Sequence, residues 1–248
     1  PAVHQQTLAL YQLVARIKAA HPGLEIESCS SGGARVDYGV LRYTDRVWTS
    51  DSNDALDRLS IQRGCSFFFP SDVMGAHVGP RDCHTTGRRV SMEMRAAVAF
   101  FGHMGIEMDP RELTPAEKTA LKAAIALHKQ QREFIHNADL YRLDSDGDAI
   151  NFGLVSPGKT KALFAYNSVR ETARTMPPRY RFAGLAPELR YQMKLVWPVR
   201  GSFKEYSASI LDELEGQIVS GEALLQFGMQ LPILHPQSAL VFELLAVE

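Results

Sequence analysis

The sequence predicts an α/β fold followed by an all-β domain, and two observations support this. Apolar runs alternate with helical patterns over the first 138 residues, which is typical of β/α units around a parallel sheet or barrel. From residue 139 onward, short segments with period-two alternation are separated by Pro, Gly and Asn turns, a pattern typical of antiparallel strands. The change near residues 137–141 predicts a boundary between a domain of residues 1–138 and a small antiparallel β-sandwich of residues 139–248.

Two helices of the first domain have the clearest signals. Residues 3–20 carry apolar side chains at i, i+3, i+4 and i+7, which form one helical face. These side chains are Leu10, Leu13, Val14 and Ile17. Residues 114–117 form a capping box, Thr-Pro-Ala-Glu, with Pro at the first helical position. This box begins the longest predicted helix, which runs to about Asn137.

The remaining elements follow from the alternation of patterns. In the first domain it predicts strands over 24–28, 46–50, 65–69 and 104–108, and helices over 55–63 and 89–100. The strand over 65–69 would make Phe67, Phe68 and Phe69 core residues. In the second domain it predicts strands over 149–155, 161–166, 179–182, 191–197, 224–229 and 239–245.

Composition excludes several classes of protein. The 248 residues are 45% hydrophobic and 22% charged, with a formal net charge of −1, so the chain is neither disordered nor collagenous. A nearly neutral chain has no field that attracts nucleic acid or anionic lipid. No apolar run is long enough to span a bilayer. We therefore expect a soluble protein with no nucleic-acid and no membrane partner.

Cysteine usage and the first residues bear on compartment and completeness. Cys29, Cys65 and Cys83 are an odd number without CxxC spacing, which favours reduced thiols over disulfides or a zinc site. This favours a cytoplasmic location. The first methionine is Met74, and the chain opens inside a predicted helix. Four β/α units are also too few to close an eight-stranded barrel. The sequence therefore predicts a fragment of a longer chain.

In β/α barrels the reacting groups follow the strands, and the loop after the first predicted strand is rich in small residues. It contains Cys29, Ser30, Gly32, Gly33 and Arg35. Paired glycines let a backbone approach a ligand closely and present its N–H groups. A sharp strand-to-helix turn explains the glycines equally well, so spacing alone leaves both interpretations open. Cys29 is not favoured as a nucleophile, because no histidine follows it closely to activate it.

The loop after the second predicted strand is acidic. Asp51 falls where the apolar run with Trp48 ends, and Asp54, Asp57 and Arg58 enter the next helix. Capping of that helix could account for these charges. A carboxylate beside Trp48, in a partly apolar environment, could also act as a general acid near neutral pH. The residues alone leave these two interpretations open.

These two loops carry spaced motifs, Cys29-x-x-Gly32-x-x-Arg35 and Ser50-Asp51-x-x-Asp54-x-x-x-Arg58. Together they resemble the paired signatures of glycoside hydrolase family 36, the microbial α-galactosidases and their raffinose-active plant relatives. The interval between Cys29 and Asp51, 51 − 29 = 22, also fits this family. Residues 74–78, 84–88 and 95–102 are similar too, so the resemblance covers nearly the whole chain.

The resemblance implies a fold and a reaction. The fold would be the C-terminal half of a (β/α)8 TIM-type barrel, with strands 5–8 in residues 1–138, followed by the β domain. The reaction would be retaining hydrolysis of terminal α-linked galactose from melibiose or raffinose, with Asp51 as acid/base. The nucleophile would be an aspartate in a Lys-Trp-Asp-type motif, which this sequence lacks and which we expect upstream of Pro1. The chain alone is therefore expected to be inactive.

The resemblance also implies substrate contacts and partners. Cys29 and the turn at Gly32 would contact the galactosyl ring. The wider set of expected substrate-binding residues is Cys29, Ser30, Gly32, Gly33, Arg35, Trp48, Asp54 and Arg58. No metal and no cofactor are expected, because a carboxylate pair performs this hydrolysis unaided. The family's microbial members imply a homo-oligomer, as a tetramer.

Four alternatives remain open, one of which is an α-N-acetylgalactosaminide in place of an α-galactoside as substrate. The fold could serve a non-catalytic carbohydrate-binding protein, or the enzyme could transfer galactose rather than hydrolyse. Residues 153–160 also match the P-loop pattern GxxxxGK[ST]. A P-loop requires a helix directly after the loop, whereas residues 161–166 have the pattern of a second strand and Pro157-Gly158 that of a hairpin turn. The pattern therefore favours a hairpin at this position.

Overall fold

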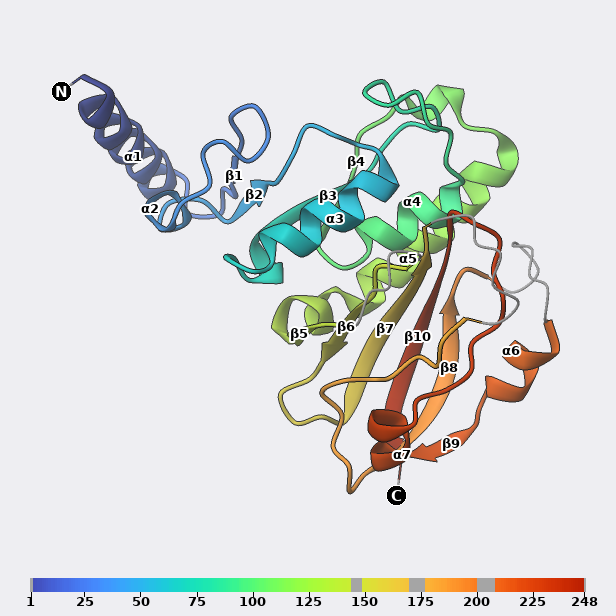
Figure 1. Ribbon diagram of the computed structural model, residues 1–248. Helices are drawn as coiled ribbons and strands as arrows, with labels where there is room; N and C mark the ends of the chain where they lie inside the picture. The colour runs from blue at the N-terminus through green and yellow to red at the C-terminus, as the bar shows by residue number, and fades with distance from the viewer. Residues whose placement is uncertain (1, 144–148, 170–176, 200–207, 248) are drawn as a thin grey trace.

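The computed structural model describes residues 2–143, 149–169, 177–199 and 208–247, and within them it contains two sheets (Figure 1). The first is parallel, with the order β1-β2-β3-β4. Its strands are β1 (Glu27–Ser28), β2 (Arg46–Trp48), β3 (Met74–Val78) and β4 (His103–Ile106). The helices of this half are α1 (Ala2–Ala20), α2 (Tyr38–Leu41), α3 (Ala55–Cys65), α4 (Met92–Ala99) and α5 (Pro115–Asn137), with short 3-10 turns at Ser71–Val73 and Pro110–Glu112. This order of strands and helices is the predicted β/α repetition.

The helices begin where capping side chains satisfy their first N–H groups. Asp54 caps α3 and Ser91 caps α4 through backbone N–H groups two to three residues on. Thr114 and Glu117 form the complete capping box of α5, with Pro at the first position, as predicted. These caps fix where the helices begin and therefore where each loop from strand to helix ends.

The second sheet is antiparallel and has the order β5-β6-β7-β10-β8-β9. Its strands are β5 (Asp139–Arg142), β6 (Phe152–Val155), β7 (Lys161–Ser168), β8 (Arg190–Trp197), β9 (Ile218–Ser220) and β10 (Ser238–Val247), with helices α6 (Ala208–Leu214) and α7 (Gly221–Gln226) beside them. The described residues thus confirm an antiparallel domain. They arrange its strands in one sheet rather than in the two facing sheets of a sandwich, and aromatic and leucine side chains from connecting segments and α7 cover one face.

The two sheets share a core because α4 and α5 lie between them (Figure 1). Apolar side chains of these helices pack against Leu154, Leu163 and Val241 of the antiparallel sheet. The Trp197 indole N–H donates to the Glu93 carbonyl at 2.8 Å across this contact. The antiparallel sheet is therefore attached to the helices through buried apolar surface, which is the main stabilising contribution of such a contact.

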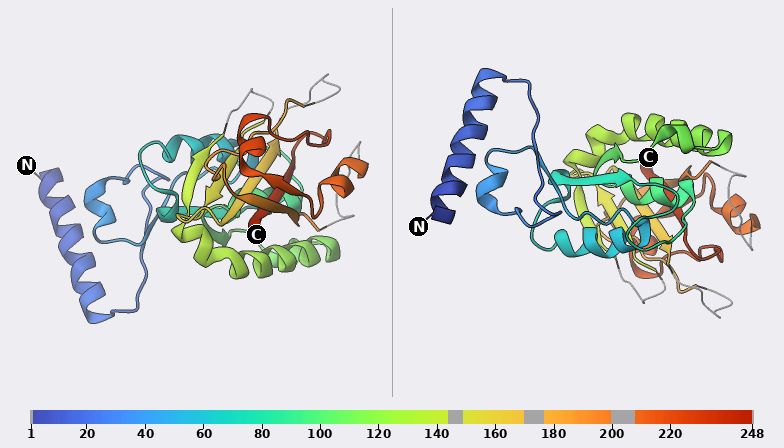
Figure 2. Two further views of the ribbon diagram at one scale, coloured as in Figure 1. Left: turned by 90° about the horizontal axis from the view of Figure 1, so that it is seen from below. Right: turned by 90° about the horizontal axis from the view of Figure 1, so that it is seen from above.

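Helix α1 forms as predicted, but it has no buried residue among those described. Leu13, on its apolar face, is 52% exposed. Figure 2 shows α1 set apart at one end of the molecule in both views. The other three side chains of the predicted apolar face are half-buried, and Tyr11 stacks on Tyr43 with the ring centroids 4.9 Å apart. The amphipathic helix therefore packs only partly against the rest of the described chain.

The predicted strand over 65–69 is wrong. Helix α3 continues to Cys65, and Phe67 and Phe68 are 61% and 71% exposed in the turn that follows. The strand of this unit is β3, Met74–Val78, which pairs in parallel with β2 on one side and β4 on the other. The prediction rested on the hydrophobicity of the aromatic run. The strand forms instead where the backbone pairs with β2 and β4.

Two predicted strands of the second domain are also wrong. Residues 221–226 form α7, because the Ser220 hydroxyl caps the N–H of Ala223 and begins a helical turn. Around 179–182 only an isolated bridge forms, between Tyr180 and Met229. Both segments instead supply apolar side chains that cover the antiparallel sheet.

Candidate active site

The loops after β1 and β2 lie against each other at the carboxyl ends of these strands. Gly32 has φ +68°, and a Cβ on it would lie 2.7 Å from Ser50 Cα and 2.9 Å from the Asp51 nitrogen. A Cβ on Gly33 would lie 2.8 Å from the Thr49 carbonyl oxygen. Only glycine fits so close to a neighbouring backbone. The structure therefore brings the predicted glycine turn and the predicted acid/base residue together.

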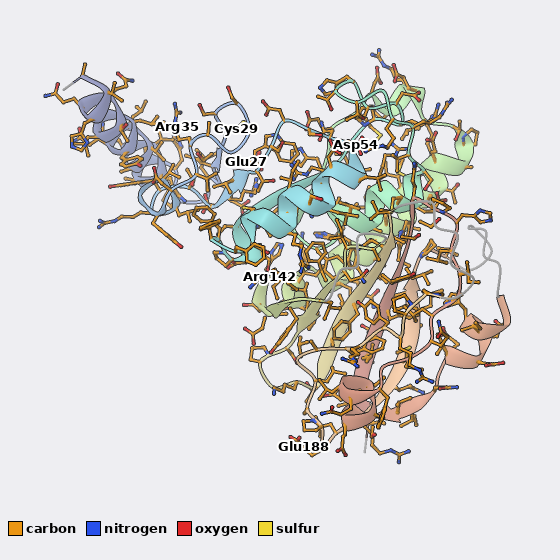
Figure 3. All side chains as sticks on the ribbon, viewed as in Figure 1. Glu27, Cys29, Arg35, Asp54, Arg142 and Glu188 are labelled. Carbon is orange, nitrogen blue, oxygen red and sulfur yellow. The ribbon has the colours of Figure 1, made fainter. Side chains whose placement is uncertain are left out.

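The outer residues of these loops are accessible. Asp51, Cys29 and Arg35 are exposed, and Figure 3 shows Cys29 and Arg35 on the loop beyond β1. The Ser30 N–H donates to the Gly32 carbonyl at 3.2 Å, which closes the turn. The partly apolar environment expected around Asp51 is not formed by the described residues, because Asp51 is exposed.

Trp48 is enclosed rather than open to a sugar. It is 5% exposed, the Arg58 guanidinium carbon lies 4.3 Å from its ring centroid, and the His77 ring stacks on it at 4.0 Å. His77 in turn lies 3.0 Å from a carboxylate oxygen of Glu107 through Nδ1. These partners leave little of the indole surface for the predicted contact with substrate.

Asp54 is 1% exposed and links the start of α3 to the loop over residues 79–91. Its carboxylate accepts hydrogen bonds from the N–H of Leu56 at the start of α3, from the Thr86 hydroxyl at 2.5 Å and from Arg88 at 2.6 Å. Burial alone would raise the pKa of Asp54, but the hydrogen bonds from Thr86, Arg88 and the backbone outweigh it and lower the pKa. Asp54 is thus an ionised, buried anchor of the loop over residues 79–91, and its predicted contact with substrate stays a prediction.

Arg58 is also 1% exposed. Its guanidinium donates to the carbonyl oxygens of Ser50 at 3.0 Å and Gly75 at 2.7 Å, and Nε donates to Gln62 at 3.3 Å. Burial lowers its pKa from 12.5 to about 10, so it remains a cation at neutral pH. Its hydrogen bonds in the described chain are therefore to the protein, and the predicted contact of Arg58 with substrate stays a prediction.

Three buried side-chain oxygens flank Asp51 without a hydrogen-bond partner among the described residues. They belong to Thr49, Ser52 and Asn53. Buried polar atoms in proteins are almost always paired. This loop therefore holds three polar side-chain oxygens that form no hydrogen bond with the described residues and that a ligand could use.

Sequence reasoning did not assign roles to Thr86, Arg88 or Glu107. The stretch over 84–88 contributed only to a resemblance, and its contact with Asp54 is non-local, so spacing gave no signal for it. The position of His77 could have been predicted, because successive side chains of a strand point to opposite faces of the sheet. His77 lies between the buried Ala76 and Val78 on β3 and therefore points to the other face.

The described residues also bear on metal binding, nucleotide binding and membrane spanning. Within residues 2–143, 149–169, 177–199 and 208–247, no three His, Cys, Asp or Glu side chains gather closely enough to hold a metal ion. The P-loop alternative is contradicted, because β6 and β7 form an antiparallel hairpin around residues 156–160 and no helix follows the loop. No helix in the described segments is both long and apolar enough to cross a bilayer.

Comparisons with known proteins agree with this architecture. Residues 1–138 match the Melibiase family, and residues 150–244 match the C-terminal domain of glycosyl hydrolase family 36. An α-galactosidase of Escherichia coli is 40% identical over 98% of this chain and 35% of its own length. The α-galactosidase AgaA of Geobacillus stearothermophilus is 37% identical over 77% of this chain and 26% of its own length.

Solved structures give the same result. A variant of AgaA in complex with raffinose superposes with a TM-score of 0.86 at 33% identity, covering 98% of this chain and 32% of that one. The galactosidase domain of the α-galactosidase–sucrose kinase AgaSK superposes with a TM-score of 0.85 at 30% identity, covering 97% and 31%. The chain thus spans about a third or less of the length of these relatives.

A parallel β/α sheet with an acidic loop at the carboxyl ends of its strands, joined to an antiparallel domain, is the architecture of a glycoside hydrolase barrel with its C-terminal extension. The sequence matches over both parts make the assignment specific. The chain belongs to glycosyl hydrolase family 36.

Proposed function

We propose that the complete protein is a retaining α-galactosidase that removes terminal α-linked galactose from oligosaccharides such as melibiose or raffinose. The observation that carries this proposal is the contact of the Gly32 turn with the Ser50–Asp51 backbone at the carboxyl ends of β1 and β2. It joins a turn suited to sugar hydroxyls and an accessible carboxylate in one place. The names of the relatives support the substrate class, and variants of AgaA have been solved with raffinose and with stachyose.

In the proposed reaction Asp51 is the acid/base. A retaining glycosidase uses two carboxylates about 5–5.5 Å apart, one of which attacks the anomeric carbon while the other protonates the leaving oxygen. Asp51 would donate that proton in the first step and take one from water in the second. A second carboxylate outside residues 1–248 would be the nucleophile, since the Lys-Trp-Asp motif does not occur in this sequence.

The galactosyl ring would lie against the turn after β1. Its hydroxyls would meet the side chains of Cys29, Ser30 and Arg35 and the backbone of Gly32 and Gly33, where no Cβ stands in the way. The buried Trp48, Asp54 and Arg58 would support this surface from behind.

Assay of the complete gene product with raffinose and p-nitrophenyl α-galactoside tests this proposal. Proton NMR of the first product should detect α-galactose before mutarotation, because double displacement retains configuration. The 248-residue chain alone should give no turnover. Galactose binding without turnover by the complete product would favour a carbohydrate-binding protein instead, and β-galactose as the first product would exclude the retaining reaction.

Two further expectations stay predictions. A homo-tetramer is tested by light scattering of the purified complete product, which would give four times the mass of one chain. A cytoplasmic location is tested by fractionation of cells that express the gene.

A further inference from the structure

Arg58 is a buried cation whose hydrogen bonds go to neutral acceptors. Its three bonding partners are the carbonyl oxygens of Ser50 and Gly75 and the side-chain oxygen of Gln62. In the described part of the chain it forms no ion pair with a carboxylate. Burying a charge without a counter-charge is costly unless hydrogen bonds and a ring face compensate. The Trp48 ring, whose centroid lies 4.3 Å from the guanidinium carbon, supplies this ring face.

The position of these hydrogen bonds in the sheet shows which backbone segment they support. The ladder between β2 and β3 consists of the pairs Val47 with Met74 and Trp48 with Gly75, and it ends there. Ser50 and Asp51 lie beyond the last pair, where no strand pairing supports the backbone. The Arg58 guanidinium joins the Ser50 carbonyl to the Gly75 carbonyl and so continues the link between the two strands past the end of the ladder.

We propose that Arg58 is a positioning residue of the proposed hydrolysis: by bridging Ser50 and Gly75 it fixes the backbone that carries Asp51 relative to the leaving group. Gly32 limits the same backbone by close contact with Ser50 and Asp51. The inference deepens the proposed function and rests on it. General acid catalysis depends on placement to within about 1 Å, so a small shift of this backbone would slow proton donation.

The geometry requires arginine rather than any cation. The planar guanidinium offers donors in fixed directions, and here three of them reach three different acceptors while its central carbon lies over the Trp48 ring. A lysine ammonium is a point charge and cannot span Ser50 and Gly75 while it also bonds Gln62. Arg58→Lys therefore keeps the charge and removes the bridge.

The test compares two substrates in the complete gene product. Raffinose has a sugar leaving group that needs protonation, whereas p-nitrophenolate leaves without it. Arg58→Lys should lower kcat/KM for raffinose about 10–100-fold and for p-nitrophenyl α-galactoside less than about threefold. Arg95→Lys is the control for loss of a buried arginine away from Asp51. Arg95 also donates to a loop carbonyl, that of Gly79, but unlike Arg58 it pairs with a carboxylate, Glu117, at 2.9 Å. Arg95→Lys should lower both values by the same factor.

A double variant separates positioning from loss of folded enzyme. In the Asp51→Ala background, Arg58→Lys should change kcat/KM for raffinose less than about twofold, since two residues acting through one group are not additive. If Arg58→Lys does not fold, Gln62→Met, which removes only one acceptor of Arg58, should show the same preferential loss to a smaller degree.

Equal losses on both substrates, or the same loss with and without Asp51, would overturn the inference. So would an unchanged kcat/KM for raffinose in Arg58→Lys. The proposed function fails separately: it fails if Asp51→Ala itself turns over raffinose normally, and it stands if Asp51→Ala is slow while Arg58→Lys is not.

Discussion

Glu117→Gln should destabilise the protein in a way that depends on pH. Glu117 accepts hydrogen bonds from Arg81, Arg95 and Thr114, which join the loop after β3 to α4 and α5. The hydrogen bond from Arg81 is the main cause that lowers the pKa of Glu117 from 4.5 to about 2, against a smaller opposing effect of burial. Such a lowering corresponds to about 3 kcal/mol of stability. The Glu117 and Arg81 side chains are 13% and 28% exposed, so screening by solvent reduces this to about 2 kcal/mol.

The sign of the pH dependence follows from the direction of the pKa. Because the folded pKa lies below the unfolded value, the ionised Glu117 stabilises the fold above about pH 4.5, and this contribution disappears as the pH falls toward about 2. Glutamine does not titrate. The difference in free energy of unfolding between wild type and Glu117→Gln should therefore be about 2 kcal/mol at about pH 7 and should close between about pH 4.5 and 2.

Urea unfolding followed by tryptophan fluorescence at several pH values measures this difference. Glu133→Gln, an exposed acid on the same helix, is the control and should change the unfolding free energy by less than about 0.5 kcal/mol. A difference for Glu117→Gln that stays constant from about pH 7 to about pH 3, or that is below about 0.5 kcal/mol throughout, would refute the reasoning.

Two further substitutions test the loops and the contact between the sheets. Gly32→Ala should lower kcat/KM for raffinose at least about 10-fold, because its Cβ would push the Ser50–Asp51 backbone out of place. Gly87→Ala is matched in φ, +69°, but its Cβ meets nothing within 4 Å, so it should change kcat/KM less than about twofold. Equal effects of the two would show that strain, and not displacement, matters. Trp197→Phe should lower the free energy of unfolding by about 1–2 kcal/mol by leaving the Glu93 carbonyl without its donor, and an unchanged urea midpoint would contradict this.

The local signals of the sequence predicted much of the fold. The capping box at Thr114 gave the start of α5 correctly, because it depends on neighbouring residues, and the predicted end at about Asn137 is also confirmed. Strand β3 was missed because Met74–Val78 contains small residues and a histidine, and only its place between β2 and β4 makes it a strand. Phe67 and Phe68 show the reverse case, since strong hydrophobicity did not bury them. The boundary near residues 137–141 stays a prediction, and α5 shares one core with the antiparallel sheet.

The site was predictable in its composition but not in its contacts. The motifs indicated the two loops, and the Gly32 contact with Ser50 and Asp51 agrees with a shared location. The expected roles of Trp48 and Arg58 could not be judged from spacing, because burial depends on residues far away in sequence, such as Gly75. Asp54 is a similar case, since its partner Arg88 lies in a loop that no local pattern connects to α3.

If Asp51 donates the proton to the leaving group, the loss of activity in Asp51→Ala should depend on the leaving group in the complete gene product. Asp72→Ala, an exposed carboxylate before β3 at the opposite end of the strands, is the control. Asp51→Ala should lower kcat/KM about 10³-fold or more for raffinose and less than about 10-fold for p-nitrophenyl α-galactoside, while Asp72→Ala changes neither. A loss of the same size on both substrates, or no loss on raffinose, would contradict the account.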